Sequence, residues 1–179
     1  MNKDKFILDA TAGNRMMWFN KHHPNTLYLD IRPEVEPDLV ADHTNIKFIP
    51  DESFQFIVYD PPHMKRPAGN YATGNLTKDY GALKSDSWEH DIQEAFKELW
   101  RVLKPTGILI FKWNDHDIPL AKISKFFPTE PLIQQISKGS ANCPYHQKCK
   151  AKLRSHARTS QTFLFTFMKI PKIKEKEVS

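Results

Sequence analysis

The sequence predicts an α/β fold in which a mostly parallel sheet carries an antiparallel hairpin at one edge. Two observations lead to this prediction. Short apolar runs that end at an acidic residue or a proline alternate with stretches of helical periodicity, as they do in β-α-β units. Two further apolar runs close the sequence with a polar, basic segment between them, which favours a final antiparallel pair.

Seven runs have the composition of buried strands. The clearest covers residues 54–59, because Pro61 and Pro62 follow it and proline cannot continue a hydrogen-bonded ladder. The full set of expected strands is 6–10, 26–31, 39–41, 54–59, 108–111, 132–136 and 162–168.

Three stretches between these strands are expected to be helical. The strongest covers 88–103, where Ile92, Phe96 and Leu99 keep the three-and-four spacing of a buried stripe. The others cover 14–22, which Pro24 ends, and 118–127. We expect helices on both faces of the sheet, a turn over 104–107 and a long loop over 64–85.

The length of 179 residues predicts one domain over 1–170, followed by a charged, disordered tail over 171–179. No apolar run approaches the roughly 20 residues that span a bilayer. The N-terminus lacks the apolar stretch of a signal peptide. We therefore expect a cytoplasmic protein without a membrane partner.

The net charge of +5 is unevenly distributed along the chain. Residues 1–130 carry 16 Lys or Arg against 19 Asp or Glu, whereas residues 131–179 carry 10 against 2. Lys152, Arg154 and Arg158 lie in this basic part, which would attract a polyanion such as a nucleic acid. A solvated basic loop without a partner is the alternative.

Four predicted strands end at or beside an acidic residue, and ligands of open parallel sheets bind beyond such strand ends. Asp30, in particular, can accept hydrogen bonds from both hydroxyls of a ribose, and Ile31 could pack on an adenine face. Asp42 is placed for an adenine amino group, or is a turn carboxylate without a ligand. The four acidic residues are Asp9, Asp30, Asp42 and Asp60.

The order of these features resembles the class I S-adenosylmethionine-dependent methyltransferases. The segment 103–109, Leu-Lys-Pro-Thr-Gly-Ile-Leu, is similar to a leucine-lysine-proline-glycine-glycine segment of that family, with Thr106 in place of the first glycine. The resemblance implies a Rossmann-like, doubly wound sheet of seven strands and S-adenosylmethionine as cofactor. The cofactor-binding residues that it implies are Asp9, Thr11, Ala12, Gly13, Asp30, Ile31, Asp42 and Asp60.

The tetrapeptide Asp60-Pro61-Pro62-His63 resembles the Asp-Pro-Pro-aromatic motif of methyltransferases that act on exocyclic amino groups of adenine or cytosine. Such an amine is a poor nucleophile, because its lone pair is delocalised into the ring. The Asp60 carboxylate and the Pro61 carbonyl could accept both N–H groups and favour a pyramidal nitrogen. The resemblance thus implies that these four residues are catalytic. His63 departs from the aromatic residue of the motif and could stack on a base or act as a base itself.

Several residues near this motif are candidates for substrate binding. Lys112, Trp113 and Asn114 could contact a phosphate, a base face and a base edge, although Trp113 could equally belong to the core. Tyr71 and Tyr80 lie in the expected loop and could cover a substrate. The basic residues Lys152, Arg154 and Arg158 are further candidates for substrate binding. The combination of Asp-Pro-Pro-His, Phe-Lys-Trp-Asn over 111–114 and a last strand that ends Phe-Met-Lys at 167–169 resembles a branch of compact methyltransferases.

The leading hypothesis is a methyltransferase that modifies a nucleobase, in RNA rather than DNA because little chain is left to read a sequence. A protein partner could supply specificity. The alternatives are a small-molecule or protein substrate, and a non-catalytic nucleic-acid-binding module on the same fold. No metal site is expected, since the spacing of Cys143, His146, Cys149 and His156 matches no common zinc motif.

Overall fold

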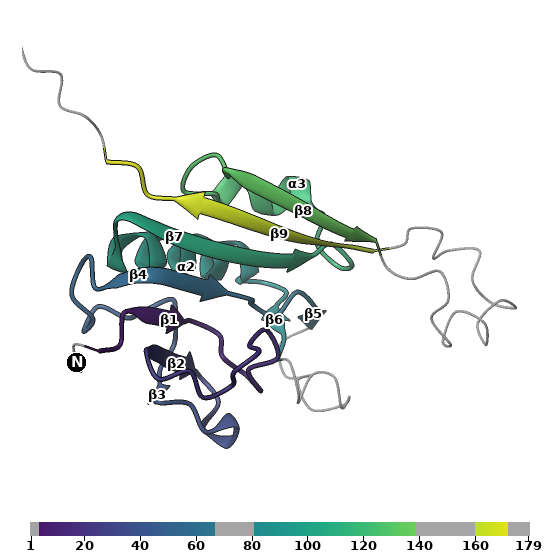
Figure 1. Ribbon diagram of the computed structural model, residues 1–179. Helices are drawn as coiled ribbons and strands as arrows, with labels where there is room; N and C mark the ends of the chain where they lie inside the picture. Colours follow the sequence, from purple (N-terminus) through teal and green to yellow (C-terminus); the bar gives the residue numbers. More distant parts are fainter. Residues whose placement is uncertain (1–3, 67–80, 139–159, 172–179) are drawn as a thin grey trace, which may run out of the picture.

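A computed structural model describes residues 4–66, 81–138 and 160–171 (Figure 1). Its main sheet has seven strands, which confirms the predicted fold class. They are β1 (Ile7–Asp9), β2 (Thr26–Asp30), β3 (Leu39–Val40), β4 (Phe54–Tyr59), β7 (Leu103–Asn114), β8 (Ile133–Lys138) and β9 (Gln161–Met168). A second, two-stranded sheet joins β5 (Lys65–Arg66) to β6 (Leu83–Lys84) within the expected loop.

The strands of the main sheet follow the order β3-β2-β1-β4-β7-β9-β8. The pairs from β3 to β7 are parallel, and β9 is antiparallel to both β7 and β8. The strand order reverses between β1 and β4, so their carboxyl ends diverge and leave room for a ligand. The final pair is the antiparallel hairpin that the sequence predicts at one edge.

Helix α2 (Trp88–Val102) forms as its periodicity predicts. Acidic residues occupy its first turn and a basic residue its last, as the helix dipole favours. Its buried stripe meets the aromatic residues of the sheet, with Phe96 edge-on to Tyr59 and to Phe111. The shorter helix α3 (Leu120–Ile123) and the 3-10 turns η1 (Pro33–Val35) and η2 (Ser124–Phe126) complete the described helical elements.

Helix α3 and turn η2 replace the single helix expected over 118–127. Pro119 is the N-cap residue of α3, so the helix begins at Leu120 and not at Ile118. The turn expected over 104–107 lies inside strand β7. It forms an irregularity in the ladder, since Leu103 pairs with Phe54 and Ile108 already pairs with Phe56. None of the described helices is both long and apolar enough to cross a membrane.

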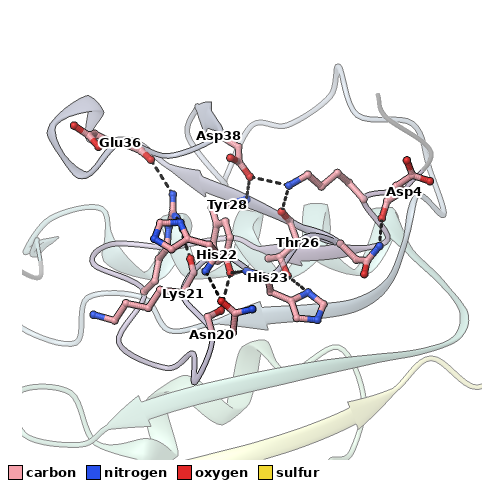
Figure 2. A network of polar contacts seen from close by, with 12 residues as sticks. Asp4, Asn20, Lys21, His22, His23, Thr26, Tyr28, Glu36 and Asp38 are labelled. Atoms are coloured by element: carbon pink, nitrogen blue, oxygen red, sulfur yellow. Dashed lines mark hydrogen bonds and ion pairs between the residues drawn. The ribbon is translucent and has the colours of Figure 1, made fainter.

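The helix predicted over 14–22 is wrong, because these residues form turns. Arg15 has a left-handed backbone with φ of 56°, which interrupts a helix, and its guanidinium lies 4.1 Å from the centre of the Tyr28 ring. Trp18 packs edge-on against the same ring. The polar network around Tyr28 adds contacts from Asn20 and Asp38 (Figure 2), so tertiary contacts decide this segment.

Helices α2 and α3 lie on one face of the sheet, behind the strands in Figure 1. The strand residues on that face, such as Ile57, Phe111 and Phe165, are buried. On the opposite face Ile110 and Leu164 remain partly exposed. In the part of the chain that the structure describes, α2 and α3 lie on this one face, and the β1–β2 connection contains turns where a helix is expected.

Candidate functional site

Two adjoining hollows lie beyond the carboxyl ends of β1, β2 and β4. The larger is lined by Asp30, Ile31 and Asp42 among others, and the smaller by Asp9, Gly13 and neighbouring residues. Thr11, Arg32 and Asp60 line both. The fold thus brings all four predicted acidic strand ends to one site, as the switch-point rule for parallel sheets predicts.

The turn after β1 joins the ends of three strands. The Ala10 N–H donates to the Val58 carbonyl at 2.9 Å, and the Ala12 N–H donates to the Leu29 carbonyl at 2.9 Å. The Thr11 hydroxyl oxygen accepts the Asp60 N–H at 2.9 Å. These bonds fix the backbone of the predicted cofactor loop relative to Asp60.

Gly13 has a left-handed backbone with φ of 47°, a conformation that glycine adopts without strain. Its N–H donates to Asp30 Oδ2 at 2.8 Å. A Cβ atom at this position would lie 3.2 Å from Arg32 Nη2, so the glycine lets the guanidinium pack against the turn.

Asp30 is buried and accepts four hydrogen bonds. Oδ1 accepts the Arg32 N–H at 2.9 Å and the Arg32 Nε–H at 3.0 Å. Oδ2 accepts Gly13 N–H and Arg32 Nη2, the latter at 3.1 Å. Burial acts to raise the pKa of Asp30, but the bonds from Arg32 and Gly13 outweigh it and hold the pKa below its usual value.

Asp9 is the most deeply buried of the acidic strand ends, and it faces the smaller hollow. Its Oδ2 accepts the indole N–H of Trp18 at 2.6 Å, and its Oδ1 accepts the Thr11 N–H at 3.3 Å. Burial is the dominant influence and raises the pKa of Asp9 to about 7, and the neighbouring carboxylates Asp60 and Asp30 act in the same direction. Asp9 is therefore partly protonated near neutral pH.

Asp42 and His43 also line the larger hollow. Asp42 Oδ1 accepts hydrogen bonds from both the N–H and the hydroxyl of Thr44, so the carboxylate stabilises the turn that follows β3. His43 Nε2 lies 3.4 Å from the Tyr59 hydroxyl, and burial lowers the pKa of His43. Ile31 is 60% exposed on the same hollow, where a flat apolar ligand could cover it.

Asp60 stands directly after β4 and forms an ion pair with Lys112 on the neighbouring strand, with Oδ2 at 2.7 Å from Nζ. Pro61 is buried, which holds the backbone of the motif rigidly. Desolvation lowers the pKa of His63, against the opposing effect of Asp60, so the ring is neutral at physiological pH. A neutral imidazole suits stacking or proton acceptance better than charge pairing.

The residues after Lys112 are held in structural contacts. Trp113 is only 1% exposed, and its indole N–H donates to the Ile118 carbonyl at 3.1 Å. Trp113 is therefore packed in the core, which is one of the two alternatives that the sequence leaves open, because its position in β7 faces the helices. Asn114 Nδ2 donates to the Thr162 hydroxyl at 2.9 Å. The Lys112 ammonium pairs with Asp60, and 37% of the Lys112 side chain remains exposed.

The remaining candidates fall outside the described residues. These are Tyr71, Tyr80, Lys152, Arg154 and Arg158, together with Cys143, His146, Cys149 and His156. Within the described parts of the chain, no cluster of three or more potential metal ligands occurs.

Sequence reasoning missed four residues of this site. His43 directly follows Asp42 and Arg32 comes two residues after Asp30, so their nearness to the site could have been inferred from these positions. Tyr59 precedes Asp60 and lines the larger hollow together with Asp91 from the first turn of α2. No local signal marks Asp91, because its distance from the other residues is set by the packing of α2 on the sheet.

No protein-family model and no curated protein matches the sequence. Solved structures with a similar fold include a SAM-dependent methyltransferase from Methanosarcina mazei, with a TM-score of 0.53 and 12% identity over 95% of this chain and 94% of that chain. TrmN from Thermus thermophilus gives a TM-score of 0.54 and 13% identity over 92% of this chain, which spans 43% of that protein.

A variant of the 16S rRNA (adenine(1408)-N(1))-methyltransferase from Catenulisporales acidiphilia gives a TM-score of 0.50 and 9% identity, over 94% of this chain and 86% of that chain. Identities this low establish a shared architecture. The strand order, the antiparallel final pair and these similarities together show that the chain has the Rossmann-like fold of SAM-dependent methyltransferases.

Proposed function

We propose that this chain is an S-adenosylmethionine-dependent methyltransferase that modifies an exocyclic amino group of a nucleobase. The observation that carries the proposal is the position of Asp60. Asp60 lines both hollows and follows directly after strand β4, at the switch point of the sheet. It is also the first residue of the Asp-Pro-Pro-His segment. A group placed there can meet a cofactor and an acceptor at the same time.

The larger hollow suits the adenosine part of the cofactor. Asp30 offers a buried carboxylate for ribose hydroxyls once its present hydrogen bonds are exchanged, and Ile31 offers an exposed apolar side chain for the adenine ring. Asp42 lines the same hollow and can accept a hydrogen bond from the adenine amino group. The bound cofactor supplies a methyl group on a positively charged sulfur, which is a strong electrophile.

The acceptor side rests on Asp60, Pro61 and His63. The Asp60 carboxylate can accept an N–H of the target amine, and the rigid Pro61 carbonyl can accept the other. His63, neutral through burial, can stack on the base and align the nitrogen for in-line attack. Methyl transfer to this nitrogen would leave the cofactor as a neutral thioether, and the proton that the nitrogen gives up would pass to solvent.

RNA is the polymer that we favour, with a protein partner as a further source of specificity. The surplus of basic residues after Pro131 supports a polyanionic substrate, and one structure of similar fold is an rRNA methyltransferase. We place this activity in the cytoplasm.

The deciding experiment transfers labelled methyl from S-adenosylmethionine to total cellular RNA, DNA and protein, followed by nucleoside analysis. We expect label in an N-methylated adenine or cytosine of RNA. Label confined to protein or small molecules would contradict the nucleobase proposal, and failure to bind the cofactor by calorimetry would contradict the enzyme assignment itself.

Two variants separate the proposed roles within the site. Asp60→Ala should abolish turnover and leave cofactor affinity within a few-fold, because the carboxylate serves the acceptor. Asp30→Ala should do the converse and weaken cofactor binding first. Lys97→Ala, on the exposed side of α2, is the control for a surface change. Equal loss of cofactor binding in both site variants would count against an acceptor role for Asp60.

A further inference from the structure

The guanidinium of Arg32 donates hydrogen bonds to the Asp30 carboxylate, which is the group that we propose binds the ribose hydroxyls. Its Nε and Nη2 atoms approach the two oxygens of Asp30 at 3.0 and 3.1 Å, and the backbone N–H of Arg32 adds a third bond. Such a two-point contact between guanidinium and carboxylate is geometrically specific and stronger than a neutral hydrogen bond.

The four bonds to Asp30 account for its acceptor capacity. A carboxylate offers about four lone-pair positions, and here Gly13 takes one and Arg32 takes three. A pair of ribose hydroxyls needs two of them. The backbone bonds from Gly13 and Arg32 belong to the turn itself, so the side-chain bonds of Arg32 are the ones that a ligand can displace.

The Arg32 side chain also has access to the smaller hollow, where it could pair with a ligand. It lines the smaller hollow as well as the larger one, and among the described residues that line the smaller hollow it is the only cation. Gly13, without a Cβ atom, leaves the guanidinium packed against the turn between the two hollows. The other acidic groups of the smaller hollow are Asp9, whose pKa is raised to about 7, and Asp60, which is paired with Lys112.

We propose that Arg32 exchanges partners when the cofactor binds, leaving the Asp30 side chain to ribose hydroxyls and pairing with the carboxylate of the amino-acid end in the smaller hollow. This inference rests on the proposed function, because it assumes a nucleoside that carries an amino acid. Arg32 is then a specificity-determining residue: it penalises nucleosides that lack the carboxylate, since these break its ion pair with Asp30 and offer no replacement.

The test compares two neutral thioethers that share the adenosine part. S-adenosylhomocysteine carries the amino-acid end, and 5′-methylthioadenosine lacks it. Calorimetric titrations of wild type and Arg32→Ala give the ratio of the two dissociation constants for each protein. We expect Arg32→Ala to bind methylthioadenosine about three-fold more tightly and S-adenosylhomocysteine about ten-fold more weakly, so that discrimination falls about thirty-fold.

The ratio of the two dissociation constants is insensitive to partial misfolding of a variant, because a misfolded fraction lowers the active concentration for both ligands equally. Arg32→Lys keeps a cation for the carboxylate but loses the two-point contact with Asp30, and its ratio should stay within several-fold of wild type. Lys97→Ala is again the surface control and should keep the wild-type ratio.

The outcomes distinguish this inference from the function on which it rests. Equal weakening of both ligands in Arg32→Ala, or an unchanged ratio, overturns the exchange while leaving the cofactor assignment intact. Tighter binding of methylthioadenosine without weaker binding of S-adenosylhomocysteine also overturns it, because no new partner then exists. Wild-type protein that binds neither ligand overturns the proposed function, and the inference with it.

Discussion

The Asp60 carboxylate and the Lys112 ammonium form an ion pair of 2.7 Å across the carboxyl ends of the neighbouring strands β4 and β7. Both side chains are partly exposed, so the pair contributes little to stability. Its more important consequence is orientation. The pair holds the carboxylate of the proposed reaction centre in one position, where the Thr11 hydroxyl already fixes its backbone.

Lys112→Met should therefore lower the rate of methyl transfer about ten- to a hundredfold, because small misplacements of a reacting group are costly. Cofactor affinity should stay within a few-fold of wild type, since Lys112 lines neither hollow. Lys112→Arg keeps the cation beside Asp60 and should lose less. Single-turnover rates at saturating cofactor, with calorimetric affinities, check this. A loss of affinity as large as the loss of rate would contradict a positioning role.

Asp9 makes the stability of the fold depend on pH in an unusual direction. In the unfolded chain the carboxyl titrates near 3.8, whereas burial raises the pKa of Asp9 to about 7 in the folded chain. Between about pH 4 and 7 the folded protein thus holds a proton that the unfolded chain has released. The contribution of Asp9 to the free energy of unfolding falls as pH rises through this window, and levels off above it.

Asp9→Asn cannot titrate and should remove this fall. The difference in free energy of unfolding, variant minus wild type, should be larger at pH 8 than at pH 4 by on the order of 2–4 kcal/mol. This is the size that a shift of about three pKa units allows. Urea unfolding at both pH values measures the difference. Glu89→Gln, on the exposed side of α2, is the control and should show no comparable gain. A pH-independent difference between Asp9→Asn and wild type would refute the raised pKa.

The strands of the main sheet were predictable because each contains an apolar run with a clear stop, whereas β5 and β6 lie in a segment without such a run. The acidic strand ends came together for the same reason, since parallel strands place their carboxyl ends at one edge. The turns over 14–22 were not predictable, because contacts of Arg15 and Trp18 with Tyr28 override the local pattern. Side-chain pairs such as Asp60 with Lys112 depend on the sheet order, which no local pattern encodes.

Thr106 lies at the irregularity in the β4–β7 ladder, where the backbone departs from the extended strand conformation. Its backbone has φ of 64°, which is strained for a β-branched residue. The Thr106 N–H donates to the Lys169 carbonyl, and the Thr106 carbonyl accepts from Gln55 Nε2. Neither hydrogen bond involves the Thr106 side chain.

Thr106→Gly should therefore stabilise the protein. Relief of the strain outweighs the extra freedom of glycine in the unfolded chain, for a net gain of about 0.5–1.5 kcal/mol. Thermal unfolding measures this as a higher midpoint temperature. Thr106→Ala keeps a Cβ atom at the same φ and should gain less than the glycine variant. A glycine variant that melts below wild type would show that the strain is not the larger effect.

Trp113 provides the last prediction, because its burial separates a core role from a substrate role. The indole stacks on Phe111 with the ring centres 6.0 Å apart, and its N–H donates to the Ile118 carbonyl. Trp113→Phe leaves a cavity and removes the donor of a buried carbonyl, which together should cost about 2–4 kcal/mol of folding free energy. Trp100→Phe, at a half-buried position on α2, should cost less than about 1 kcal/mol. Urea unfolding compares the two variants. If Trp113→Phe keeps wild-type stability but raises KM for the nucleic-acid substrate, then the side chain contacts the substrate and the core assignment fails.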